Sequence, residues 1–345
     1  MLGHKQSLSF SVANSKSLML SHLELACRLS RLCSVIHAQP RKPVSKGKIM
    51  LYLFPLLAVL IWAGNSIVNK LSFGIIDPEA IAFYRWFFAM LLLTPFVARR
   101  VWQKRQVILP LLPKFATLAM LGMVLNQSLA YFAAATTTAT NMALITSLVP
   151  MISLFLAVPL LKQKLSPLAF GGTLISLVGL IFMLSHGDMM NLAIGVTQGD
   201  LLLLISAFVY ALYGVLLKRW QLPLPTWESV YIQGLIAVFM LTPLLFSSPS
   251  MAISTQSAPL ILYAAVAASL LAPWAWINGI SKLGADRTSV FFNLMPIIAA
   301  ILAAIILDET LAIYHYIGGS MVIMGVMLVQ IKPKPKAIPT LACPE

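Results

Sequence analysis

Arg85 has the clearest potential for chemistry, because it is the only formally charged side chain well inside an apolar segment. A guanidinium buried in hydrocarbon costs roughly 2.5 kcal/mol or more, so it should face a polar cavity or a partner. It would then attract an anionic group, such as a carboxylate on a bound molecule, through paired hydrogen bonds. Two other roles stay open: the side chain could reach the membrane interface, or it could pair with Asp77 or Glu79.

Amide and aromatic side chains in other apolar segments could complete a site around such a cation. Asn65 and Asn69 are four residues apart, which places both amides on one face of a helix, although such amides also join helices to each other. Gln233 aligns with Arg85 in the second half of the chain and keeps a hydrogen-bonding group without the charge. The remaining candidate substrate contacts are Asn126, Tyr131, Tyr210, Tyr213, Trp274, Trp276 and Asn278. A cavity with aromatic walls and a few amides suits a small zwitterion or an amphipathic metabolite.

Pro150 and Pro296 each lie about ten residues into an apolar segment, at equivalent places in the two halves. A proline removes one backbone hydrogen bond and leaves a carbonyl free, which is tolerated in a membrane where it lines a cavity or meets another helix. Paired helix breaks in two opposed halves point to a central binding and gating site. The alternative is that both are packing kinks.

Motifs of enzymes and metal sites are missing from the sequence. It contains no Gly-x-Ser-x-Gly, no His-Glu-x-x-His, no phosphate-binding glycine loop and no Cys/His metal spacing. We therefore expect no catalysis and no cofactor. The acidic residues of the apolar region fall at loops or helix ends, so coupling through a carboxylate deep in the membrane is not expected.

The elements that must position these residues are membrane spans. With 59% hydrophobic residues, 10% charged residues and a mean hydropathy of +0.89, the chain has far more apolar surface than a water-soluble globule can bury. Apolar runs of about 20 residues can each cross the hydrocarbon. Ten are predicted, at 51–70, 80–98, 115–134, 139–161, 166–185, 200–218, 228–247, 258–280, 287–307 and 312–331.

The net charge of +14 is explained by topology rather than by a nucleic-acid partner. All but two of the 24 Lys and Arg residues fall in the terminal arms or in the alternate loops that share one side of the membrane with them. This distribution follows the positive-inside rule, and it predicts a multi-pass protein of the cell inner (plasma) membrane with both termini in the cytoplasm.

The chain also repeats itself. Moving residues 139–185 forward by 146 positions superimposes seven Ala, Pro, Leu and Gly residues on identical ones, including Pro150 on Pro296. The same shift places Lys162-Gln163-Lys164 on Asp308-Glu309-Thr310, so one connection is cationic and its counterpart is anionic. Opposite charges at equivalent loops are expected of two repeats that face opposite ways across a membrane.

Four regions follow from these patterns. We predict a first five-helix repeat at 50–185, a second at 199–331 and a cytoplasmic tail at 332–345. The basic, Ser-rich arm at 1–49 is predicted to be disordered; it could be a targeting segment or an upstream extension of a reading frame that begins at Met50.

Several of these motifs resemble one known family. The first apolar segment contains Trp62-Ala63-Gly64-Asn65 and Asn69-Lys70, the second contains Tyr84-Arg85-Trp86, and the last loop contains Asp308-Glu309-Thr310-Leu311. Together they resemble the ten-helix, EamA-type branch of the drug/metabolite transporter superfamily. In the first half Gln163 stands where the family usually has Glu.

The resemblance covers residues 50–331 and implies an all-α integral membrane fold of ten helices in two inverted five-helix repeats. It also implies that the fifth and tenth helices pack outside those that form the cavity. The expected function is export or exchange of a small polar metabolite, an amino acid or related compound, by alternating access. The alternatives are a drug or nucleotide-related carrier, or a receptor or scaffold that does not transport. The expected partners are a small-molecule substrate and the lipid bilayer, with no nucleic acid; the sequence does not set the oligomeric state.

Overall fold

The computed structural model describes residues 46–162, 167–188, 196–283, 288 and 291–330. Residues 1–45 of the predicted arm and the tail from residue 331 lie outside this range. The body of the chain, Ile49–Pro333, is one compact unit. Its described residues form helices, turns and loops and include no strand, as the sequence predicts.

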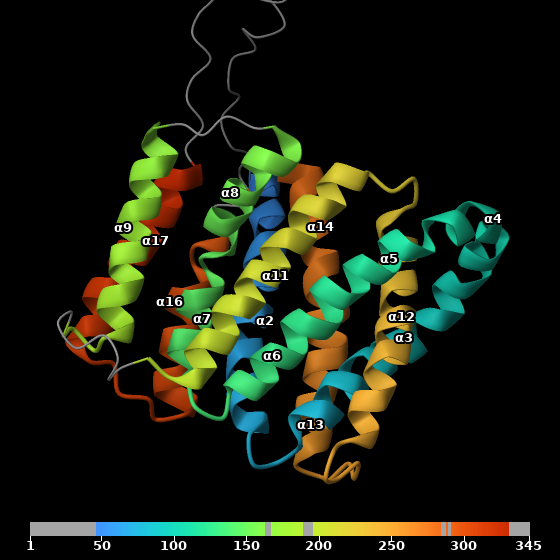
Figure 1. Ribbon diagram of the computed structural model, residues 1–345, viewed down its shortest axis with the longest axis horizontal. Helices are drawn as coiled ribbons and strands as arrows, with labels where there is room; N and C mark the ends of the chain where they lie inside the picture. The colour runs from blue at the N-terminus through green and yellow to red at the C-terminus, as the bar shows by residue number, and fades with distance from the viewer. Residues whose placement is uncertain (1–45, 163–166, 189–195, 284–287, 289–290, 331–345) are drawn as a thin grey trace, which may run out of the picture. The chain divides into compact units, whose positions relative to one another are not determined.

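The helices follow one another in the order expected of two repeats (Figure 1). In the first half they are α2 (Lys46–Ser72), α3 (Pro78–Gln103), α4 (Arg105–Ile108), η1 (Leu109–Leu111), α5 (Leu112–Ala119), η2 (Met120–Leu125), α6 (Asn126–Ala133), α7 (Ala139–Thr146), α8 (Val149–Leu161) and α9 (Pro167–Leu184). In the second half they are α11 (Gln198–Trp220), α12 (Thr226–Phe246), α13 (Ser257–Leu262), η3 (Tyr263–Leu271), α14 (Ala272–Leu283), α16 (Met295–Ile306) and α17 (Ile313–Gln330).

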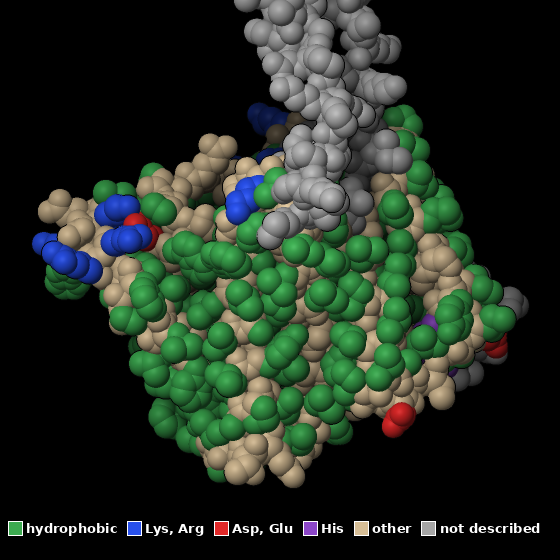
Figure 2. Space-filling view, turned by 180° about the vertical axis from the view of Figure 1, so that it is seen from behind, with side chains coloured by type: hydrophobic (Ala, Val, Ile, Leu, Met, Phe, Trp, Pro, Cys, Tyr) green, Lys and Arg blue, Asp and Glu red, His purple; other side chains and the backbone are tan. Residues whose placement is uncertain are grey.

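Length and hydropathy qualify eight of the described helical segments as membrane spans, and α16 and α17 are shorter apolar helices at the ninth and tenth predicted positions. Large hydrophobic side chains lie on their outer surfaces: Phe239 is 80% exposed and Phe96 is 74% exposed. Figure 2 shows hydrophobic side chains over most of one face, with Lys and Arg in its upper part. Such a surface is suited to lipid rather than to water.

The two halves bend their backbones at the same places. The fourth predicted span is interrupted by a turn at 147–148, just before Pro150, and the ninth by a turn at 293–294, just before Pro296. The two turns are 146 residues apart, which is the offset of the sequence repeat. A left-handed residue follows each of the next helices: Lys162 directly after α8, with φ of 54°, and Asp308 two residues after α16, with φ of 52°, again 146 apart. The backbone thus changes direction at equivalent places of the two repeats.

Helices α9 and α17 lie side by side and touch through four glycines (Figure 1). A Cβ on Gly179 would lie 2.7 Å from the carbonyl oxygen of Gly318, and Gly172 faces Gly325 in the same way. Because the residue numbers rise along one helix as they fall along the other, the helices are antiparallel. Gly172 and Gly318 are repeat counterparts, as are Gly179 and Gly325, so each contact is the image of the other. Two inverted five-helix repeats have this arrangement.

Candidate functional site

Arg85 lies in the first half of α3, is 3% exposed, and is surrounded by neutral hydrogen-bond acceptors. Its Nε donates to the Ser269 hydroxyl of η3 at 2.8 Å. Its Nη1 donates to Gln127 Oε1 at 2.9 Å, and to Asn65 Oδ1 and the Tyr131 hydroxyl at 3.3 Å each. Four elements, α2, α3, α6 and η3, therefore meet at one guanidinium.

Amide groups extend this cluster in two directions. On one side, Gln127 donates to Asn126 Oδ1 at 3.0 Å, and Asn126 donates to the Ser206 hydroxyl of α11 at 3.0 Å. On the other side, Asn65 donates to Asn69 Oδ1 at 3.3 Å, so the four-residue spacing does place both amides on one face of α2. The result is a polar path through the apolar interior, formed by residues of both repeats. We call Asn65, Asn69, Arg85, Asn126, Gln127, Tyr131 and Ser269 the Arg85 cluster.

No carboxylate neutralises Arg85 among the described residues, where the one ion pair joins Lys104 to Glu228 at 2.8 Å. The predicted alternative partner Asp77 instead accepts hydrogen bonds from the Ser248 hydroxyl at 3.0 Å and the Ser250 N–H at 2.8 Å. The Arg85 guanidinium is also directed into the protein, toward α2, α6 and η3, and is buried there. Within the described part of the chain its Nη2 donates no hydrogen bond, which leaves N–H groups for a further acceptor.

Two π-helical turns shape the walls of this cluster. Segment η2 directly precedes Asn126, and segment η3 contains Ser269, whose hydroxyl donates to the carbonyl oxygen of Ala264, five residues earlier, at 2.8 Å. π-Helical turns are rare and occur mainly as single turns at functional sites. They occupy corresponding parts of the third and eighth spans. The sequence predicted neither turn, and it did not indicate Ser269.

Aromatic side chains form a second group of packed residues, in addition to the Arg85 cluster. The rings of Trp62 and Trp276 have centroids 5.5 Å apart, and Phe292 lies 6.0 Å from Trp62 and 5.8 Å from Trp276. Trp62 donates from its indole N–H to the Ala268 carbonyl oxygen at 3.3 Å, one residue before Ser269. This group thus joins α2, which carries Asn65, to η3, which carries Ser269.

Tyr210 and Tyr213 of α11 stack with ring centroids 5.6 Å apart. Tyr210 is close enough to Arg85 to be influenced by its charge. Tyr213 packs on η2 at Gly122, where a Cβ would lie 2.7 Å from its ring. Both predicted tyrosines therefore lie at the side of α11 that faces the third span.

Three predicted residues lie apart from the Arg85 cluster. Gln233 is buried, but its amide donates to Ser229 within its own helix. Trp274 is 41% exposed and lies with its ring against Phe54, while Asn278 donates to the Trp274 carbonyl oxygen at 2.9 Å. Among the described residues, none of these three side chains hydrogen-bonds to Arg85.

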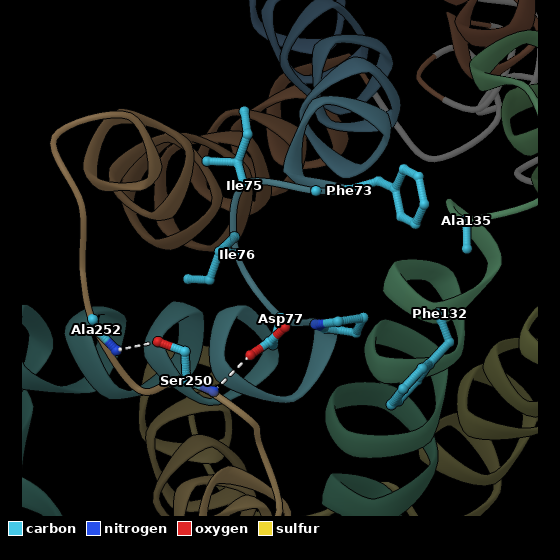
Figure 3. A pocket seen from close by; sticks show the side chains of 10 residues that line it. Phe73, Ile75, Ile76, Asp77, Phe132, Ala135, Ser250 and Ala252 are labelled. Atoms are coloured by element: carbon cyan, nitrogen blue, oxygen red, sulfur yellow. Dashed lines mark hydrogen bonds between the residues drawn. The ribbon is translucent and has the colours of Figure 1, made fainter.

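A pocket of about 350 Å³ opens at the end of the body where α2 ends and α3 begins. Figure 3 shows that Asp77 points at the Ser250 backbone, while Phe73 and Phe132 form apolar walls. None of the Arg85 cluster lines this pocket. Asp77, Asp200, Asp308 and Glu309 belong to the same end of the helices, which we call the acidic end; Arg99, Lys104, Lys218 and Lys282 mark the opposite, basic end.

Comparisons with known proteins agree with this architecture. A family model described as the EamA-like transporter family matches residues 49–185 and 197–331. An uncharacterized transporter of Archaeoglobus fulgidus is 27% identical, with 81% of this chain and 97% of that protein covered. The uncharacterized transporter YyaM of Bacillus subtilis is 26% identical, with 79% and 91% covered. One crystal structure superimposes with a TM-score of 0.56 and 15% identity, over 81% of this chain and 96% of that one, which shows the fold alone.

Proposed function

Because the chain belongs to the EamA-like transporter family, and is thus a multi-pass membrane transporter, we propose that it exports or exchanges a small metabolite that carries a carboxylate. An amino acid or a related compound is the proposed cargo. The Arg85 cluster would hold the carboxylate, and alternating access would expose the cluster to each side of the membrane in turn.

The observation that carries this proposal is the uncompensated charge of Arg85. A buried cation is normally paired, and here the described partners are hydroxyls and amides. Neutral acceptors satisfy part of the guanidinium but leave its positive charge available to an anion. A carboxylate also matches the forked N–H geometry of arginine. A bulky polyanion would require several buried cations, which favours a cargo with a single anionic group.

The neighbouring groups support a cargo of modest size. Tyr210 and Tyr213 stack on α11, and Trp62 and Trp276 pack together where α2 meets η3; these rings supply aromatic surface, while the amides of the Arg85 cluster can orient a second polar group of the cargo. The helix breaks before Pro150 and Pro296 give each half a place where the backbone changes direction. We propose that these breaks allow the two ends to open alternately.

We further propose that the protein lies in the inner (plasma) membrane of the cell. The acidic end would face outward, and the basic end would face the cytoplasm. The charge distribution along the loops supports this orientation.

The test is flux from proteoliposomes loaded with a panel of labelled amino acids, other carboxylates and uncharged drugs, for the wild type beside Arg85→Gln. Arg99→Gln is the matched control, because Arg99 is exposed and the same charge is removed outside the cluster. Saturable flux of a carboxylate-bearing cargo that is lost in Arg85→Gln and kept in Arg99→Gln supports the proposal. Equal flux in all three proteins, or flux of uncharged compounds alone, overturns the assignment of Arg85.

A further inference from the structure

At the acidic end, the short connection between α6 and α7 is held by charged side chains from other parts of the chain. Lys70 at the end of α2 donates to the carbonyl oxygens of Ala134 and Thr137, each at 2.8 Å. From the second repeat, the buried Asp200 accepts a hydrogen bond from the Thr137 hydroxyl at 2.5 Å and one from the Asn141 amide at 3.4 Å. This connection therefore attaches the first repeat to the second.

Glu309 makes the most extensive of these attachments. Its carboxylate accepts from the N–H of Ala139 at 2.7 Å, from the N–H of Thr140 at 3.2 Å and from the Thr140 hydroxyl at 2.8 Å. These N–H groups belong to the first turn of α7, where backbone donors lack helical partners and the helix dipole favours a negative charge. The bond spans 170 residues of sequence between Glu309 and Ala139.

The turn before Glu309 fixes this geometry. Asp308 adopts a left-handed conformation with φ of 52°, and the N–H of Glu309 folds back onto the Ala303 carbonyl oxygen at 3.2 Å. The side chain is thereby presented to α7 by a tight loop rather than by a flexible one. Glu309 is partly exposed, whereas the α7 residues that it binds are buried.

Helix α7 also has a cap from its own repeat. Thr138 already fills that role, because its side chain accepts from the Asn141 N–H at 3.1 Å. Glu309 is thus a second cap that comes from the opposite repeat. Moreover, α6 carries Gln127 and Tyr131, which bind Arg85, and it ends directly at the connection that is held.

We propose that Glu309 is a positioning residue for transport, which latches the second repeat onto α7 and keeps the acidic end closed over the Arg85 cluster. Release of the carboxylate from α7 would free the connection after α6, so that this end can open. The inference rests on the proposed transport function, because only a carrier has to open this end in its cycle.

The test measures from which side of the membrane a reagent reaches the interior of the protein, and it needs no cargo. A single cysteine at Ser128, next to Gln127 on α6, reports access, in a protein whose Cys27, Cys33 and Cys343 are replaced by serine. Labelling by a membrane-impermeant maleimide is compared in right-side-out and inside-out vesicles. Glu309→Gln should raise labelling from the acidic end roughly tenfold, the change that about 1.4 kcal/mol produces, and lower labelling from the basic end.

Three further variants separate a latch from a local structural role. Asp308→Asn removes the same charge one residue away and should leave the labelling rates from both ends unchanged, since Asp308 makes no hydrogen bond to α7 within the described part of the chain. Thr140→Val removes the hydroxyl that donates to Glu309. It should shift the labelling rates from the two ends in the same directions as Glu309→Gln, but less. Glu309→Asp keeps the charge and should restore most of the wild-type preference.

A rise in labelling from both sides in Glu309→Gln would mean general loosening and would overturn the latch, as would unchanged rates. Because labelling does not depend on cargo, a positive result stands even if the flux panel shows no transport.

Discussion

The two repeats use the same backbone but different side chains. Both have a turn before a central proline, a left-handed residue after the next helix, a π-helical stretch and paired glycines on the last helix. Their polar residues differ: the first repeat supplies the cation Arg85 and the amides around it, whereas the second supplies Ser269 and the tyrosines of α11. Inverted symmetry thus constrains how the chain bends, while the polar groups of the candidate site can be concentrated in one half.

The largest effect is expected when the cation is moved from one half to the other. Arg85→Gln should lower carboxylate flux by at least about 100-fold, which corresponds to roughly 2.8 kcal/mol. The double variant Arg85→Gln/Gln233→Arg should not recover it, because Gln233 bonds only to Ser229 of its own helix among the described residues. Flux assays on proteoliposomes check both. Recovery in the double variant would show that the two positions are functionally equivalent.

The symmetric contact between α9 and α17 gives a second test, on stability. Gly172→Ala places a Cβ 2.6 Å from the Gly325 carbonyl oxygen, and overpacking of this kind costs roughly 1–3 kcal/mol. Gly318→Ala should cause a similar loss, because it is the counterpart in the other repeat. Thermal unfolding in detergent measures the effect. The control is Gly171→Ala, where nothing lies within 4 Å of the new Cβ; equal destabilisation by this variant would contradict the assigned contact.

The opposite charges of the two equivalent loops can be exchanged. Gln163 corresponds to Glu309 in the sequence repeat but lies outside the described residues. Glu309→Lys gives the loop of Glu309 the cationic character of its counterpart and should raise maleimide labelling of the reporter cysteine from the acidic end by at least roughly tenfold, because it removes the acceptor of the α7 N–H groups and places a cation at a helix N-terminus. Unchanged or reduced labelling from the acidic end would show that the charge of this loop does not hold α7.

A smaller effect is expected at Ser269, the one second-repeat side chain that hydrogen-bonds to Arg85 among the described residues. Ser269→Ala removes one hydrogen bond to the guanidinium, worth about 1.5–3 kcal/mol at most for a charged donor. The other acceptors remain, so we expect a loss of a few-fold in carboxylate flux, mainly as a raised KM. Concentration-dependent flux measures it, with Ser128→Ala as a control hydroxyl without a hydrogen-bond partner in the described residues. A loss as large as that of Arg85→Gln would mean that Ser269 is essential to the site.

Much of this fold could be predicted from the sequence, because its physical causes are local. Long apolar runs predict the spans, and the 146-residue repeat predicts that the two halves bend alike; a turn does precede both Pro150 and Pro296. The environment of Arg85 was predicted in part: Asn65 and Tyr131 do bind it.

Other features depend on tertiary contacts that no local pattern reveals. Ser269 faces Arg85 because η3 is a π-helical stretch, which changes the angle between successive side chains and defeats a prediction based on 3.6 residues per turn. Glu309 was identified as part of a motif, but its bond to α7 joins segments 170 residues apart. Gln233 has the expected chemistry, yet its amide nitrogen donates to Ser229, one helical turn away in its own helix.

The reciprocal glycine contact has one more consequence. Gly172 with Gly325 and Gly179 with Gly318 form a pair of contacts that the internal two-fold axis exchanges with each other, and between them Ser176 donates to the carbonyl oxygen of its own counterpart, Val322, at 3.2 Å. When an inverted-repeat carrier changes sides, each half takes the shape that the other had before. The two-fold axis maps this interface onto itself, so an exchange of shapes between the two halves leaves the interface unchanged. Helices α9 and α17 can therefore serve as the stationary pivot of the molecule.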